Sequence, residues 1–162
     1  MINEADVRTW MKRIGGKHLF WVEPARGSTF GLPDAYCAIN GLGHLWFELK
    51  YGTLHLNDCL TFELRPEQRA TMRRLLDAGG RVALAVGYFG AVSPIILRAN
   101  ERVLSGKVHL PQAIEADLAV VAGTKIDEKS LEKIMSWEAK NRGKSEMMGA
   151  KKKSAQREKV EA

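Results

Sequence analysis

Two apolar segments joined by a tight turn constrain the fold of this chain more than any other feature. The first covers residues 35–39 and the second residues 44–50, and an Asn-Gly-Leu-Gly sequence at 40–43 separates them. An Asn-Gly pair between two apolar runs is a strong signal for a β-hairpin. The sequence therefore predicts two adjacent antiparallel strands, the first beginning after Asp34 and the second ending in Glu48-Leu49-Lys50.

This hairpin would bring two carboxylates together. Asp34 ends a Gly-Leu-Pro-Asp turn immediately before the first strand, and Glu48 and Lys50 close the second. Because side chains alternate across a strand, Glu48 and Lys50 point to one face of the sheet and Leu49 to the other. Burying a carboxylate and an ammonium group on a strand costs free energy, so their presence there indicates a functional role. We therefore interpret Asp34 and Glu48 as parts of one site.

The same residues suit a divalent cation. Carboxylate oxygens from Asp34 and Glu48, with a backbone carbonyl such as that of Leu49, are ligands for a hard cation such as Mg²⁺. Lys50 would then lie beside the metal, where it could position or activate a water molecule or stabilise negative charge developing on a phosphate. This combination predicts metal-dependent hydrolysis of a phosphodiester, with Mg²⁺ or Mn²⁺ as the cofactor.

Pro33-Asp34 followed by Glu48-Leu49-Lys50 resembles the signature of the PD-(D/E)XK nuclease superfamily. Within it, the chain is similar to small phage and bacterial nucleases of the VRR-NUC and Holliday-junction-resolvase type. The Gly-x-Pro-Asp turn, the strand closing in Glu-Leu-Lys and an Arg-Pro-Glu-Gln sequence at 65–68 follow in the order typical of that group, over residues 1–98. The resemblance implies DNA as substrate and a place for Gln68 in the active site. The junction-resolvase type further implies a homodimer acting on branched DNA.

The remaining periodicities predict an α/β domain. They indicate a helix that ends at residues 15–16, a strand at 19–23, a helix at 66–78 and strands at 81–88 and 94–97. Together with the hairpin this gives the order α-β-β-β-α-β, a mixed central sheet flanked by helices. That order agrees with the restriction-endonuclease-like core implied by the resemblance. The Tyr51-Gly52-Thr53 sequence predicts that the second hairpin strand ends there.

Three regions are predicted along the chain. Residues 1–100 would form the nuclease core, and residues 101–140 a helical extension packed on it, with helices at 111–122 and 127–140. Residues 141–162 are charged and poor in large apolar groups, so disorder or a marginal helix is expected. This tail holds seven Lys or Arg against three Glu, which is +4 of the net +6 and leaves +2 for residues 1–140. The folded body is therefore only mildly basic, although its sign suits a polyanionic partner.

Further residues are candidates for supporting the metal or contacting DNA. Glu4 could lean toward the metal from the first helix, although a Glu in a first turn also complements the helix dipole in solvent. Gln68 could hydrogen-bond a metal-bound water, hold a catalytic side chain, or only satisfy backbone groups at its helix start. His55 is more often structural than functional in such a loop. The candidates for phosphate contact, each of which could instead be an ordinary solvated side chain, are Arg26, Ser28, Thr29, Arg69 and Arg73.

Composition excludes several other classes of protein. No run approaches the roughly 18 apolar residues of a membrane span, and the start lacks a signal-peptide pattern. A cytoplasmic protein without membrane contact is therefore expected, and the resemblance implies a bacterium or a phage-infected cell as its source. Cys37 and Cys59 have no metal-ligand spacing and are expected to be reduced thiols. Nothing resembles a phosphate-binding glycine loop, a zinc cluster or a nucleophilic triad, and no organic cofactor is expected.

The sequence thus predicts a metal-dependent endodeoxyribonuclease in which Asp34, Glu48, Lys50 and Gln68 form the active site. Two alternatives stay open. A linear-duplex, nicking or single-strand nuclease of repair or restriction would use the same residues, and the sequence does not separate RNA from DNA as substrate. A non-catalytic nucleic-acid-binding protein would keep the fold. A protein that keeps this fold without activity has usually lost a metal ligand or the Lys, however. Here Asp34, Glu48 and Lys50 are all present.

Overall fold

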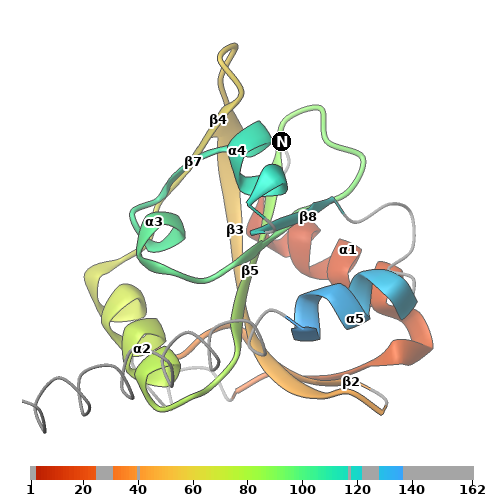
Figure 1. Cartoon of the computed structure of the whole chain (residues 1–162). Helices are drawn as coiled ribbons and strands as arrows, with labels where there is room; N and C mark the ends of the chain where they lie inside the picture. The colour runs from red at the N-terminus through yellow and green to blue at the C-terminus, as the bar shows by residue number, and fades with distance from the viewer. Residues whose placement is uncertain (1–2, 25–30, 40, 117, 122–127, 137–162) are drawn as a thin grey trace, which may run out of the picture.

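The computed structural model describes residues 3–24, 31–39, 41–116, 118–121 and 128–136. The phosphate contacts predicted for Arg26, Ser28 and Thr29, and the charged tail at 141–162, lie outside these residues. The described residues form a sheet with helices on both of its faces (Figure 1). The chain is therefore mixed α/β, as predicted.

An eight-stranded mixed sheet forms the centre of the described chain. Its strands are β1 (Leu19–Val22), β2 (Ala35–Ile39), β3 (Gly43–Leu54), β4 (Cys59–Phe62), β5 (Val82–Tyr88), β6 (Ile95–Arg98), β7 (Lys107–His109) and β8 (Ala119–Val121). The main path has the order β1-β2-β3-β5-β6-β8, and β4 and β7 lie off it because β4 pairs with β3 and β7 with β4. Neighbouring strands are antiparallel except β3 and β5, which are parallel. The predicted hairpin is thus confirmed as β2 and β3.

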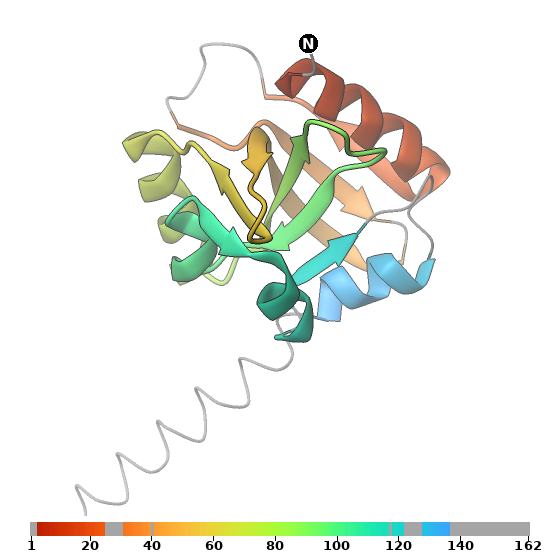
Figure 2. The same cartoon turned by 90° about the horizontal axis from the view of Figure 1, so that it is seen from above.

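Helices cover both faces of this sheet. They are α1 (Glu4–Gly15), α2 (Pro66–Asp77), α3 (Glu101–Leu104), α4 (Leu110–Glu115) and α5 (Glu128–Ser136), with a short 3-10 turn, η1 (Gly16–His18), after α1. α1 and α5 lie on one side of the sheet and α2 and α3 on the other (Figure 2). The buried stripe of α1 packs with Phe47 and Leu49 of β3, whereas Met72 of α2 packs in a second core with Leu84 of β5. Successive side chains of the central strands therefore enter different cores.

The start of α1 is specified locally, by the residues at its first turn. The side chain of Asn3 accepts hydrogen bonds from the backbone N–H groups of Ala5 and Asp6, and the carboxylate of Asp6 accepts one from the N–H of Asn3 at 2.7 Å. This reciprocal cap satisfies donors that the first turn of a helix leaves free. It also places Glu4 at the first helical position, at the end of α1 that lies nearest to β3 residue Lys50.

β3 runs four residues past Lys50, so the strand end predicted at residues 51–53 is wrong. The strand continues through Gly52 to Leu54 and returns as β4 after residues 55–58. A Cβ atom on Gly52 would lie 2.5 Å from the backbone oxygen of Thr61 in β4. Glycine at this position therefore permits a close approach of the neighbouring strand and does not end its own strand.

The region after residue 100 contains strands as well as helices, so the prediction of a purely helical extension is wrong. The helix expected at 111–122 ends at Glu115, and Ala119–Val121 forms β8. β8 pairs with β6, which would otherwise present an open row of backbone groups at the edge of the sheet. Of the helix expected at 127–140, the structure describes α5 at Glu128–Ser136.

The structure also bears on the cysteines and on membrane contact. Cys37 and Cys59 are buried and free, as expected for reduced thiols. Burial raises the pKa of the Cys37 thiol to about 12, which makes this thiol unreactive. Among the residues that the structure describes, no helix has the length and apolar character that crossing a membrane requires.

Candidate active site

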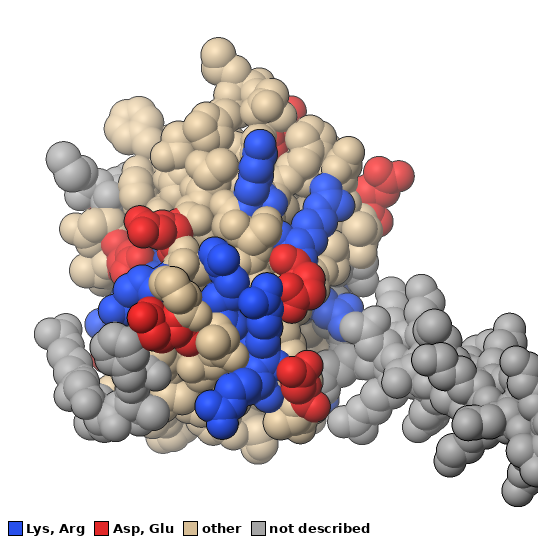
Figure 3. All heavy atoms as spheres, turned by 90° about the vertical axis from the view of Figure 1, so that its left-hand side faces the viewer, with Lys and Arg blue, Asp and Glu red and all other residues tan. Residues whose placement is uncertain are grey.

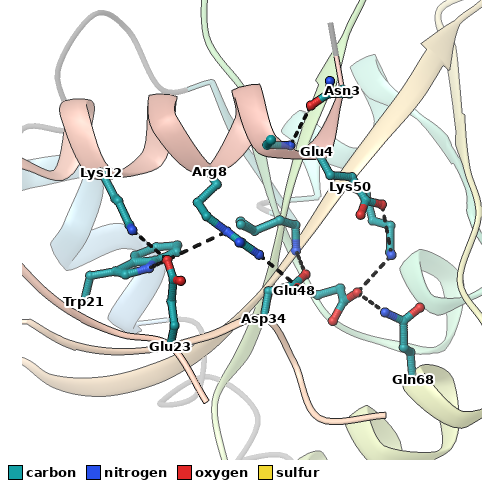
Figure 4. Close-up of polar contacts among 12 residues, drawn as sticks. Asn3, Glu4, Arg8, Lys12, Trp21, Glu23, Asp34, Glu48, Lys50 and Gln68 are labelled. Carbon is teal, nitrogen blue, oxygen red and sulfur yellow. Dashed lines mark hydrogen bonds and ion pairs between the residues drawn. The ribbon is translucent and has the colours of Figure 1, made fainter. Parts of the chain in front are cut away.

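The predicted site lies at a gap along one edge of β3. β5 pairs with one edge of β3 from Trp46 to Gly52. On the other edge, β2 reaches only as far as the pair formed by Ala35 and Phe47, and β4 begins at the pair formed by Gly52 and Phe62. In the described chain, residues 48–51 therefore have a paired strand on one edge only. Asp34, Glu48 and Lys50 all lie at this gap (Figure 4).

The backbone of Leu49 faces the gap. Its N–H donates a hydrogen bond of 2.9 Å to Oδ2 of Asp34, whereas the N–H of Trp46 points the other way, to the carbonyl of Arg81. In a strand the N–H and C=O of one residue point to the same edge, so the Leu49 carbonyl also faces the gap. Continuing the register of β2 sets Pro33 opposite Leu49, and proline has no N–H to donate. The Leu49 carbonyl is thereby spared a strand partner and fits the predicted role of a metal ligand.

Glu48 is a fully buried carboxylate with one oxygen left over. Its Oε1 accepts hydrogen bonds from Nε2 of Gln68 and, at 3.0 Å, from Nζ of Lys50. Its Oε2 is also buried but has no hydrogen-bond partner. Burial, followed by the charge of Asp34, raises the pKa of Glu48 from 4.5 to about 7, against the opposing effect of Lys50. A buried, unpartnered carboxylate oxygen is unfavourable on its own, and a bound cation would satisfy it.

Lys50 is held as a cation. Its side chain is 8% exposed, and its Nζ lies 3.0 Å from Oε1 of Glu48 and 3.2 Å from Oε1 of Glu4. Burial lowers the pKa of Lys50, but the charges and hydrogen bonds of Glu48 and Glu4 outweigh burial and raise it above its ordinary value. Lys50 can therefore donate hydrogen bonds to a water or an anion, but it is unsuited to accept a proton. Glu4 reaches the site from α1, so the solvent-only interpretation of this residue is not what the structure shows.

Gln68 links the start of α2 to Glu48. Its Oε1 accepts a hydrogen bond of 3.1 Å from the N–H of Arg65, and its Nε2 donates to Oε1 of Glu48. Because the backbone of Arg65 engages the amide oxygen, the amide nitrogen has to face Glu48. Two of the predicted roles of Gln68 therefore occur together: it satisfies a backbone group at the helix start and holds a site carboxylate.

Replacing Gln68 by Met is expected to lower the free energy of unfolding by about 1–3 kcal/mol, because the buried carboxylate of Glu48 and the N–H of Arg65 each lose a partner. Chemical denaturation at pH 8 measures this loss. Gln112→Met, at an exposed position of α4, is the matched control and should change stability by less than about 0.5 kcal/mol. Equal effects of the two substitutions would show that the buried amide has no special role.

The turn that carries Asp34 is fixed to α2 by glycine. Gly31 has a φ of +82°, and a Cβ there would lie 2.8 Å from the carbonyl oxygen of Glu67 in the first turn of α2. Both the backbone conformation and the close contact favour the absence of a side chain. The turn holding Asp34 and the helix holding Gln68 are therefore packed against each other, which sets the distance between the two sides of the site.

Gly31→Ala is expected to cost at least about 2 kcal/mol of stability, since the left-handed conformation alone costs an L-residue about 1 kcal/mol and the new methyl group also meets backbone. Gly41→Ala separates the two effects. Gly41 also has a positive φ, of +76°, but a Cβ there would have no neighbour within 4 Å. Thermal denaturation of both variants tests this, and equal losses would exclude the contact with α2 as a cause.

The donor set fits a Mg²⁺ or Mn²⁺ ion. Asp34 and Glu48 supply carboxylates, Leu49 supplies a carbonyl, and Oε2 of Glu48 has no other partner. No group of three or more His, Cys, Asp or Glu side chains suited to a metal comes together in the described ranges. Mg²⁺ does not require one, because it keeps several of its waters and is usually bound through one or two carboxylates.

The residues predicted to contact DNA are distributed differently. Arg69 and Arg73 lie on α2, where the charges of both act on Glu101 of α3, and Arg73 makes a bidentate contact with Glu101 at 2.6–3.2 Å. Lys and Arg side chains gather on the molecular face that carries α2, with acidic groups at the borders (Figure 3). His55 pairs its ring with the hydroxyl of Thr61 at 2.9 Å across the β3–β4 hairpin, which is the structural role expected for it.

Arg8 was not predicted from the sequence, although its spacing offered a signal. It lies one helical turn after Glu4 on α1, and its guanidinium group lies 3.6 Å from Oδ1 of Asp34. A residue four positions after a candidate site residue shares its helix face and should reach the same site.

Comparison with known protein families and with curated proteins found no match for this chain.

Proposed function

We propose that this protein is a metal-dependent endonuclease that hydrolyses DNA phosphodiester bonds with Mg²⁺ or Mn²⁺. The observation that carries the proposal is the meeting of Asp34, Glu48 and Lys50 at the gap in the sheet, with Oε2 of Glu48 buried and without a partner. Two acidic oxygens, a carbonyl and a fixed ammonium group form a set that few other chemistries need. We further propose that α1, β1, β2, β3, α2 and β5 form a restriction-endonuclease-like core, into which β4 is inserted.

The division of roles follows from the contacts. Asp34, Glu48 and the carbonyl of Leu49 would hold the cation, whose chemistry is to polarise the phosphate and to activate a water molecule. Lys50, kept protonated by its two carboxylate neighbours, would orient the attacking water or stabilise the charge that develops on the phosphate. Gln68 fixes the rotamer of Glu48, and Glu4 fixes the ammonium group of Lys50. Water would attack in line, without a covalent enzyme intermediate.

The charge balance of the site supports a phosphodiester as substrate. Glu4, Asp34 and Glu48 contribute three negative charges when ionised, and Arg8 and Lys50 two positive charges, so the site carries −1. One divalent cation would change this to +1, a sign that favours binding of a phosphate. The arginines of α2 and the overall charge of +6 would add attraction for the rest of a nucleic acid. A homodimer that presents two such sites to branched DNA is the assembly we propose.

A non-catalytic nucleic-acid-binding protein is the alternative. One observation favours it: Lys and Arg side chains gather on the face that carries α2, and such a face could bind a nucleic-acid backbone without any cation. Against it, Asp34, Glu48 and Lys50 are all present and Glu48 is held in a costly buried position. Binding alone would give no reason to keep that arrangement. The two functions differ in whether DNA is cut when a divalent cation is added.

Cleavage of a matched set of labelled substrates tests the proposal. A four-way junction, a flap, a linear duplex, a single strand and an RNA strand would each be incubated with Mg²⁺, Mn²⁺ or EDTA. Wild-type protein should cut DNA only in the presence of the cation, and Glu48→Ala should not cut. Glu63→Ala, an exposed carboxylate outside the site, is the matched control and should cut normally.

The pattern of products separates the alternatives. Cutting confined to the four-way junction would identify a junction resolvase. Cutting of every DNA substrate would support the proposed active site and exclude selectivity for branched DNA. Cutting of RNA alone would support the proposed hydrolysis and show that the substrate is RNA and not DNA. DNA binding without cleavage in either cation would contradict the proposal and leave the binding protein.

A further inference from the structure

Charged side chains follow one another along α1 at intervals of one helical turn, and each lies opposite a group of the other sign. They are Glu4, Arg8 and Lys12, and their partners are Lys50, Asp34 and Glu23 (Figure 4). Positions separated by four residues share one helix face. The first two members of this row, Glu4 and Arg8, therefore reach candidate site residues, and the second is a cation next to a proposed metal ligand.

Arg8 is held in place by charge and not by hydrogen bonds to its two acidic neighbours. Its terminal nitrogen lies 3.6 Å from Oδ1 of Asp34, and its Nε lies 3.7 Å from Oε1 of Glu23. Both distances exceed the usual length of an N–H···O hydrogen bond. The Nε atom is also buried and has no hydrogen-bond partner. A guanidinium group with donors to spare thus faces the site without being fixed in it.

Glu23, by contrast, is firmly anchored. Its Oε1 accepts hydrogen bonds from Nζ of Lys12 at 2.7 Å and from the indole N–H of Trp21 at 2.9 Å. The hydrogen bond from Lys12, followed by that from Trp21, lowers the pKa of Glu23, so this carboxylate stays ionised. Glu23 therefore supplies a fixed negative charge 3.7 Å from Nε of Arg8, and a terminal nitrogen of the same guanidinium group faces Asp34.

The carboxylate of Asp34 cannot easily bind a metal ion while it also faces the guanidinium group of Arg8. Its Oδ2 accepts the N–H of Leu49, and its Oδ1 faces Arg8. A divalent cation that binds Asp34 would approach a carboxylate whose charge a guanidinium group already balances, and two cations at such a range repel each other. Arg8 would then need another anion, and the phosphate of a substrate bound at the same place would provide one.

We propose that Arg8 balances the charge of Asp34 in the metal-free protein and contacts the substrate phosphate once a divalent cation is bound. This inference rests on the proposed nuclease function. It assigns to Arg8 two measurable effects of opposite sign. The residue weakens the binding of the cation in the absence of DNA, and it strengthens cleavage when both are present.

The first effect is measured without any activity. Calorimetric titration of metal-free protein with Mn²⁺ compares wild type with Arg8→Met, Arg8→Lys and Arg13→Met. Arg8→Met should bind Mn²⁺ about tenfold more tightly, since one unit of positive charge leaves the vicinity of the site. Arg8→Lys keeps the charge and should stay within about threefold of wild type. Arg13→Met removes the same group from an exposed position of α1 and should leave the affinity unchanged.

The second effect is measured at saturating Mn²⁺ with a DNA substrate that the wild type cuts. Arg8→Met should cleave about 10–100-fold more slowly than Arg13→Met, because a phosphate contact is lost. Arg8→Gln, which is also neutral, replaces Arg8→Met in both measurements if Met at this position prevents folding.

The outcomes of these measurements distinguish failure of the role of Arg8 from failure of the proposed nuclease function. Unchanged Mn²⁺ affinity in Arg8→Met, in a protein that still binds Mn²⁺ and cuts DNA, would overturn the role of Arg8 and leave the nuclease standing. Absence of Mn²⁺ binding in the wild type and in every variant would overturn the proposed function itself, and with it this inference. Tighter Mn²⁺ binding by Arg8→Met, combined with slower cleavage, would establish both proposed effects of Arg8.

Discussion

Replacing Glu48 by Gln is expected to flatten the dependence of stability on pH between pH 5 and 8 and to abolish cleavage. The pKa of Glu48 is raised from 4.5 to about 7 in the folded protein, by burial first and then by the charge of Asp34. Between these two pH values the folded protein holds a proton that the unfolded chain releases. The contribution of Glu48 to the free energy of unfolding therefore falls as the pH rises through this window, by at most about 3 kcal/mol.

The amide introduced by Glu48→Gln would not titrate, so the variant should gain stability relative to wild type as the pH is raised from 5 to 8. The raised pKa of Lys50 acts only above about pH 10, outside this window. Chemical denaturation in EDTA at a series of pH values measures the difference. Glu63→Gln, at an exposed position, should follow the wild-type curve. If Glu48→Gln also ran parallel to wild type, Glu48 would not be a buried acid with a raised pKa.

Lys50→Met is expected to slow cleavage by about 10²–10³-fold, the size seen when one fixed donor to a transition-state charge is removed. Methionine is close to lysine in length and fits a largely buried position, so binding of DNA in Ca²⁺ should be nearly unchanged. Single-turnover cleavage in Mg²⁺, with Lys107→Met at an exposed position of β7 as the control, measures the effect. Cleavage by Lys50→Met at the rate of the control would remove Lys50 from the mechanism.

The central part of the site could be predicted because its signals are local. The Asn-Gly turn sets β2 beside β3, and alternation along β3 then puts Glu48 and Lys50 on the same face. The helix start at Pro66 likewise brings Gln68 to the buried side of α2. Each of these inferences needs only neighbouring residues, and the structure brings Asp34, Glu48, Lys50 and Gln68 together.

The contributions of α1 were harder to predict because they depend on long-range packing. Lys50 and Glu4 are 46 residues apart, and their contact requires that α1 cross the sheet with its first turn at the gap in β3. A helical periodicity gives the buried face of a helix but not the position along the sheet at which its polar face arrives. For this reason Glu4 stayed open between two interpretations and Arg8 was missed.

The short strands escaped prediction for a different reason. β4, β7 and β8 have three or four residues each, too few for an alternating pattern to stand out. They form because β3, β4 and β6 offer backbone donors and acceptors that need partners. The glycine at position 52 was interpreted as a strand end, although it serves the close contact with β4. A glycine inside an apolar run permits both interpretations, and only the neighbouring strand decides between them.

The most direct test is the position of a bound cation. Crystals of the protein soaked in Mn²⁺ would give an anomalous difference peak wherever this ion binds. We expect a single strong peak at the gap in β3, about 2 Å from a carboxylate oxygen of Asp34 and from Oε2 of Glu48, and no peak in Glu48→Ala. A peak elsewhere, or the same peak in the variant, would contradict the assignment of this site as a metal-dependent nuclease centre.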